Sequence, residues 1–134
     1  MARVIVGMSG GVDSAAAAYL LKQAGYDVVG VTLRTWVGAD GEDSRCCEID
    51  DARETARILG IPYHVFNCVS DFEKKVVRPF IADYLHGLTP NPCVVCNREI
   101  KWERLLYMPG SSTPISSQRG ITLRSCGWKT DAIP

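Results

Sequence analysis

Residues 4–14 leave few choices of fold, because an apolar run leads directly into a glycine-rich loop and then into a helix-forming segment. Val4, Ile5 and Val6 form the run, and the loop reads Gly-Met-Ser-Gly-Gly-Val-Asp-Ser. A short β-branched stretch indicates a buried strand, and the alanines from residue 15 onward indicate a helix. Glycine backbone can approach an anion closely, and a helix start carries partial positive charge. The segment therefore predicts a phosphate-binding strand–loop–helix unit.

Composition supports a single soluble domain. The chain has 134 residues, 46% of them hydrophobic, and its 15 basic and 15 acidic residues give no net charge, so no overall field predicts a nucleic-acid partner. Without a signal peptide or a membrane-length apolar stretch, we expect a cytoplasmic protein with no membrane contact. Six cysteines without other signs of secretion favour reactive or metal-binding thiols over a disulfide framework.

Strand-like and helix-like segments alternate along the chain. Strands are expected at about 3–8, 27–33 and 63–67, and helices at about 13–25 and 47–59. An apolar stripe from Phe72 to Leu85 predicts a further helix packed into the core and kinked or split at Pro79. This alternation predicts βαβ units and a parallel sheet, with a nucleotide at the carboxyl edge of the first strand.

A cysteine-containing turn follows, reading Thr-Pro-Asn-Pro-Cys-Val-Val-Cys-Asn over residues 89–97. We expect Asn97 to cap a final helix, which would place Cys96 just before a helix start, where the dipole favours a thiolate. By itself the pair Cys93 and Cys96 has three interpretations: a redox pair, half of a metal site, or a catalytic cysteine beside an incidental one. A structural role for both is the simplest alternative.

The loop matches the SGGxDS signature of PP-loop ATP pyrophosphatases, and it lacks the lysine of the commoner P-loop. Together with Gly30–Leu33 before Trp36, Ala52–Pro62 and Thr89–Asn97, it makes residues 1–106 closely resemble the N-terminal domain of bacterial tRNA 2-thiouridylases (tRNA-uridine 2-sulfurtransferases). The resemblance implies an α/β fold with a Rossmann-like parallel sheet of the PP-loop (adenine nucleotide alpha-hydrolase-like) type, incomplete at its C-terminus.

The resemblance also implies a reaction. ATP would adenylate O2 of the wobble uridine of certain tRNAs, and sulfur from a cysteine persulfide would replace that oxygen. Leu33 would contact the adenine, and the ATP loop would comprise Gly7, Met8, Ser9, Gly10, Gly11, Val12, Asp13 and Ser14. Asp13 could hold a Mg²⁺ that travels with the nucleotide.

Further roles follow from the same resemblance. Asn91, Pro92 and Cys93 would meet the target base, and Cys96 would be the nucleophile. The implied partners are tRNA and a sulfur donor such as a cysteine desulfurase or a sulfur-relay protein. A second cysteine far downstream carries the persulfide in the family and can form a disulfide with the first.

Cys93 departs from the family pattern, because many members have aspartate there. Cysteine is a poorer acid–base group at neutral pH but a better soft-metal ligand. An iron–sulfur cluster held by Cys93, Cys96 and a third cysteine is therefore a further interpretation. We assign no role to Cys46 and Cys47, and we expect Cys68 to be packed.

After Leu106 the chain loses all helical and strand periodicity, where the family continues with a helix, a strand and the motif Thr-Gly-His-Tyr. Joining the last base of each codon to the first two of the next, with permitted wobble bases, turns residues 107–123 into YARELDADFVATGHYA, which contains that motif. We therefore expect residues 1–106 to be an incomplete PP-loop domain and 107–134 a frameshift-derived, poorly ordered tail. Cys126 would not be the second catalytic cysteine, and the fragment would be inactive alone.

Two other hypotheses stay open. The chain could belong to another PP-loop adenylating enzyme, such as a different tRNA thiolase, an argininosuccinate synthetase or an amidotransferase, although the turn at residues 91–97 argues against these. It could also be a fragment that binds ATP without catalysis. Single-turnover thiolation of tRNA would distinguish these hypotheses.

Overall fold

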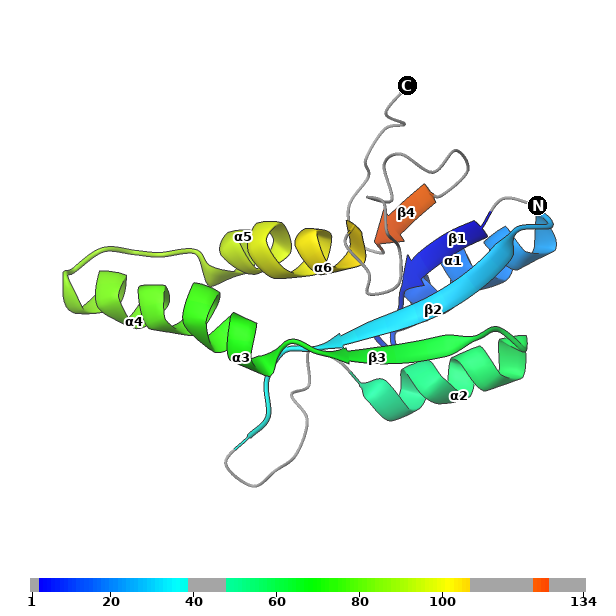
Figure 1. The fold of residues 1–134 in the computed structure, drawn as a ribbon, viewed down its shortest axis with the longest axis horizontal. Helices are drawn as coiled ribbons and strands as arrows, with labels where there is room; N and C mark the ends of the chain where they lie inside the picture. Colours follow the sequence, from blue (N-terminus) through cyan, green and yellow to red (C-terminus); the bar gives the residue numbers. More distant parts are fainter. Residues whose placement is uncertain (1–2, 39–47, 107–121, 126–134) are drawn as a thin grey trace.

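The computed structural model describes residues 3–38, 48–106 and 122–125, whose strands form one parallel sheet (Figure 1). The sheet order is β3-β2-β1-β4, and each neighbouring pair runs parallel. The strands are β1 (Arg3–Gly7), β2 (Asp27–Arg34), β3 (Tyr63–Asn67) and β4 (Thr122–Ser125). The predicted α/β fold with a parallel sheet is confirmed.

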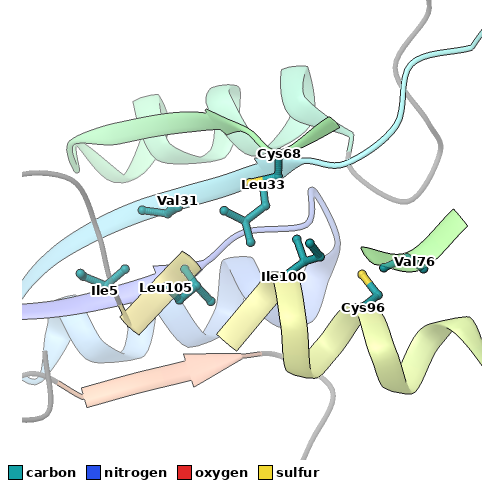
Figure 2. Close-up of a cluster of buried hydrophobic side chains, with 8 residues drawn as sticks. All are labelled: Ile5, Val31, Leu33, Cys68, Val76, Cys96, Ile100 and Leu105. Carbon is teal, nitrogen blue, oxygen red and sulfur yellow. The ribbon is translucent and has the colours of Figure 1, made fainter. Parts of the chain in front are cut away.

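Both faces of β1 are covered. Val4 and Val6 are fully buried, and Ile5 between them is nearly so. Because successive residues of a strand face opposite sides, Val4 and Val6 join a core cluster with residues of the helices α1 (Val12–Gln23) and α2 (Ile49–Leu59). Ile5 joins a second cluster, drawn in Figure 2. Burial on both faces explains why this strand is an uninterrupted apolar run.

The helices α1 and α2 end close to the predicted residues. Gly25 follows α1 with a φ of +84°, and Gly60 caps α2 with a φ of +60°. Glycine adopts this left-handed conformation without steric cost, so it stops a helix efficiently. The predicted start of the second helix at residue 47 lies outside the described residues. Among the helices that the structure describes, none has the length and apolar character needed to cross a membrane.

Residues 69–85 form one helical segment of three parts. These are α3 (Val69–Phe72), a π-helix η1 (Glu73–Val77) and α4 (Arg78–Leu85). Pro79 is near the start of α4, so the distortion predicted there takes the form of a π-helical stretch immediately before it. Proline has no N–H to donate, and its ring crowds the carbonyl four residues earlier, which a wider turn accommodates.

The apolar stripe on this segment is buried only in its first half. Val76 is 3% exposed, whereas Ile81, Tyr84 and Leu85 are at least half exposed. The prediction that the whole stripe packs into the core is therefore wrong. Figure 1 shows the reason: α4 runs out beyond the sheet, away from the strands.

The final helical segment starts earlier than predicted. It comprises α5 (Pro92–Cys96), a π-helix η2 (Asn97–Trp102) and α6 (Glu103–Leu106). The side chain of Asn91 caps it by accepting a hydrogen bond from the Val94 amide at 3.3 Å. Pro92 takes the first helical position, where its missing N–H costs nothing. Asn97 has helical φ and ψ of −60° and −48°, so the prediction that it caps this helix is wrong.

The two helical segments lie side by side (Figure 1), joined by ion pairs. Lys75 Nζ lies 2.6 Å from Glu103 Oε2, and Arg104 pairs with Asp71. All four side chains are partly exposed, so these pairs contribute little to stability.

Four residues of the predicted tail are described. In β4, Thr122–Ser125 pairs with Val4–Gly7 of β1. The rest of residues 107–134 lies outside the described part of the chain. The domain boundary at residue 106 and the poor order of the tail stay predictions.

Candidate functional site

The predicted ATP loop joins β1 to α1 at the carboxyl end of β1. The strand ends at Gly7, and the helix starts at Val12, with Gly11 in an extended conformation at the N-cap position. Gly10 has a φ of +86°, and a Cβ atom built on it would lie 2.7 Å from the carbonyl oxygen of Glu48. Only glycine fits this position, because both the backbone angle and the space exclude a side chain.

Two serine hydroxyls hold the loop in shape. Ser14 Oγ donates to the Gly11 carbonyl at 2.9 Å and accepts from the Ser9 amide at 3.3 Å. The Gly11 amide in turn donates to Ser9 Oγ at 3.3 Å. Ser14 is 1% exposed, and Ser9 is exposed. The loop is therefore closed by hydrogen bonds of its own side chains.

The exposed part of the loop carries one carboxylate. Asp13 lies in the first turn of α1 with its residue exposed, next to the exposed Val12. Within the described residues, no three His, Cys, Asp or Glu side chains come together to hold a metal ion. A Mg²⁺ at Asp13 would therefore need oxygen ligands from a nucleotide and from water.

A further set of hydrogen bonds connects Met8 of the loop to β2 and, through Thr32, to β3. The Met8 amide donates to the Val31 carbonyl at 2.8 Å, and Thr32 Oγ1 donates to the Met8 carbonyl at 2.6 Å. Tyr63 Oη donates to Thr32 Oγ1 at 2.7 Å. Sequence reasoning missed Thr32 and Tyr63. The available signal was a hydroxyl in an otherwise apolar strand, since a buried polar group needs a hydrogen-bond partner.

The start of α2 also contacts the loop. The Glu48 amide donates to the Ser9 carbonyl at 3.3 Å, and the Glu48 side chain stands against Gly10. Tyr63 Oη lies 3.3 Å from the carbonyl of Ile49, the first residue of α2. The loop is thus attached to β2, β3 and α2 as well as to its own helix.

Leu33 and Cys96 meet in the second core cluster (Figure 2). Leu33 is 8% exposed near the end of β2, and Cys96 is 9% exposed in the last turn of α5. Figure 2 shows Cys96 beside Val76, with Ile100 on the next turn of its helix. Met8 belongs to the opposite cluster. The structure therefore places Cys96 and the predicted adenine contact in one cluster, and Met8 of the loop in the cluster on the other face of the sheet.

The two cysteines of the turn have different surroundings. Cys93 is exposed, whereas Cys96 is buried inside a continuous helical segment. The helix-start argument for a Cys96 thiolate therefore does not apply, because the helix starts at Pro92. Cys68 is also buried, as predicted, and this burial raises the pKa of its thiol, with Arg104 opposing the rise and Cys96 adding to it. Among the described residues, Cys68, Cys93 and Cys96 form no disulfide; Cys46, Cys47 and Cys126 lie outside the described residues.

The model of the tRNA methyl transferase HUP domain family matches residues 2–113. The chain belongs to this family. The match covers the loop, the three strands β1 to β3 and the cysteine turn of the HUP domain. Membership of the family identified from the sequence is confirmed.

Relatives of this HUP domain are tRNA-specific 2-thiouridylases. The enzyme MnmA of Lachnoclostridium phytofermentans is 53% identical over 113 residues, which cover 79% of this chain and 32% of that protein. MnmA 1 of Caldanaerobacter subterraneus subsp. tengcongensis is also 53% identical, with 78% of this chain and 30% of that protein covered. The chain spans about a third of the length of the curated relatives it matches.

A solved structure agrees on the fold of the HUP domain. The U34-tRNA thiolase NcsA from Methanococcus maripaludis, solved with its 4Fe–4S cluster, superposes with a TM-score of 0.52. The two chains are 23% identical, and the match covers 78% of this chain and 32% of NcsA. At this identity the likeness shows the fold alone.

Proposed function

We propose that this chain is the ATP-binding part of a tRNA 2-thiouridylase. The enzyme would adenylate O2 of the wobble uridine in tRNA and then replace that oxygen with sulfur to give 2-thiouridine. The observation that carries the proposal is the closed loop between Gly7 and Ser14 at the start of α1, in a chain 53% identical to a protein with that name. Helix starts of this kind suit phosphate groups.

The loop residues have distinct tasks in this proposal. Backbone amides of the loop and the positive end of α1 would face the phosphates of ATP, and Asp13 would share a Mg²⁺ with them. Because the Leu33 side chain is turned into the core cluster, a contact with adenine at this residue would use its backbone. Attack of uridine O2 on the α-phosphorus would then release pyrophosphate and leave AMP on the base.

The cysteine turn would serve the sulfur step. Asn91, Pro92 and Cys93 would meet the target base, and Cys96 would be the nucleophile. Cys96 would attack the inner sulfur of a persulfide carried by a second cysteine, so that a disulfide forms and the outer sulfur passes to C2 as AMP leaves. A cysteine desulfurase or a sulfur-relay protein would supply the persulfide. Since Cys96 is 9% exposed, its helix must shift before this step.

An iron–sulfur cluster has no place in this proposal. Cys93 faces solvent while Cys96 faces the core, and no third ligand joins them within the described residues. Such a cluster needs several cysteine thiolates at one point. The cysteines that the structure describes do not fit one, and no step passes through it.

The chain alone is expected to bind ATP but not to thiolate tRNA, since it spans about a third of the length of its relatives. The test joins residues 1–106 to the remaining part of the L. phytofermentans relative and measures single-turnover formation of 2-thiouridine with a persulfide donor. The fusion should thiolate tRNA, Cys96→Ser should abolish the reaction, and the 134-residue chain should show none. Normal thiolation by the Cys96→Ser fusion would contradict the assignment of the nucleophile.

A further inference from the structure

Met8 is the first residue of the ATP loop after β1 ends at Gly7. Its carbonyl accepts the last hydrogen bond of a chain that runs from the Tyr63 hydroxyl through the Thr32 hydroxyl. A carbonyl oxygen can only accept a hydrogen bond, so the single proton of Thr32 Oγ1 points to Met8 across 2.6 Å. Thr32 Oγ1 can then only accept from Tyr63, whose hydroxyl lies 2.7 Å away. Thr32 is 1% exposed, so water does not compete for these bonds.

The Tyr63 hydroxyl also lies close to α2, the helix whose start contacts the loop. Its hydroxyl lies 3.3 Å from the Ile49 carbonyl in the first turn of α2. One residue earlier, the Glu48 amide donates to the Ser9 carbonyl. Because its one proton goes to Thr32, the Tyr63 hydroxyl is hydrogen-bonded toward Met8 and only lies close to the start of α2.

The Tyr63 ring supports this placement by packing. It lies against the cluster that contains Met8, and its Cδ2 atom would be 3.3 Å from a Cβ atom on Gly30. The same Cβ would be 2.5 Å from Met8 Sδ. The absence of a side chain at Gly30 thus lets both Met8 and Tyr63 close over β2.

From these contacts we infer that Tyr63, acting through Thr32, is a positioning residue for the ATP loop. It touches no reacting atom. Its hydroxyl holds Met8, through Thr32, in one arrangement, and this fixes where the ATP loop leaves the sheet. The role rests on the proposed function for its consequence, tighter ATP binding, but the arrangement itself is a property of the folded chain.

The test uses the 134-residue chain with two measurements, hydrogen exchange of a peptide covering residues 7–14 without nucleotide, and equilibrium binding of ATP at fixed Mg²⁺. Tyr63→Phe removes only the hydroxyl, and Thr32→Val keeps the shape of the side chain while removing its donor. Tyr63→Phe loses one hydrogen bond and should speed exchange in the loop and weaken ATP binding by about threefold to tenfold. Thr32→Val loses both bonds of its hydroxyl and should change both measurements in the same direction, by at least as much.

Two controls separate positioning from general stability. Thr32→Ser keeps the hydroxyl and should restore both measurements, and Tyr26→Phe makes the same chemical change in the turn after α1 and should alter neither. Unchanged loop exchange in Tyr63→Phe, or an equal rise in a peptide from β2, would overturn the inference. A wild-type chain that fails to bind ATP would contradict the proposed function, and loop exchange would still decide the role of Tyr63.

Discussion

Replacing Gly10 by alanine should be among the most damaging single-methyl changes in this chain. Its φ of +86° lies in the region that L-residues avoid, at a cost of about 1–2 kcal/mol. The added Cβ would also lie 2.7 Å from the Glu48 carbonyl oxygen and 2.8 Å from the Glu48 Cβ. Moving backbone out of such an overlap costs about 1–3 kcal/mol more. The free energy of unfolding should therefore fall by about 2–5 kcal/mol.

The chain offers a matched control at Gly25. Its φ is +84°, and a Cβ there would meet nothing within 4 Å. Gly25→Ala should thus lose only the conformational part, about 1–2 kcal/mol, and it should bind ATP normally. Urea unfolding of both variants gives the steric part as the difference, and titration with ATP shows its effect on the loop. Equal destabilisation by the two variants, or normal ATP binding by Gly10→Ala, would refute the claim that α2 fixes the loop through this contact.

Three further outcomes are expected. Asp13→Ala should weaken ATP binding at fixed Mg²⁺ without changing the urea midpoint, because the carboxylate is exposed; equal affinity with and without Mg²⁺ in the wild type would contradict this role. Iodoacetamide should label Cys93 well before Cys96 and Cys68, as mass spectrometry of the peptides would show, and faster labelling of Cys96 would contradict its burial. Because burial raises the pKa of Cys68, the unfolded chain loses this thiol proton first as the pH rises, so stability should fall above about pH 8.5. Cys68→Ala should flatten this decline in unfolding experiments between pH 7 and 10, and an unchanged slope would show that Cys68 is not its cause.

Local patterns predicted the strands and the loop well because each depends on neighbours in the sequence. The strand at residues 63–67 was predicted with the bounds that the structure has, and Gly25 and Gly60 end their helices as expected. The glycines and serines of the ATP loop predicted its place at the carboxyl end of β1. These features follow from backbone preferences that a sequence displays directly.

Features that depend on distant contacts could not be predicted in the same way. The spacing of Ile81 and Leu85 predicts an apolar helix face, but periodicity does not say which part of that face the sheet reaches. Asn91 and Asn97 are equally able to cap a helix, and Pro92 decides between them. The bond between Tyr63 and Thr32 joins residues 31 positions apart, so only the parallel pairing of β2 and β3 brings them together.

Burial of Cys96 gives the resting protein chemical protection at the residue proposed to react. Oxidants and alkylating agents attack exposed thiolates, and this sulfur is enclosed with Leu33, Val76 and Ile100 in a packed cluster. Exposing it means opening contacts of Ile100, which is fully buried, so the thiol stays shielded while these contacts hold. For the proposed reaction, this means that movement of the helix has to precede any chemistry at the thiol.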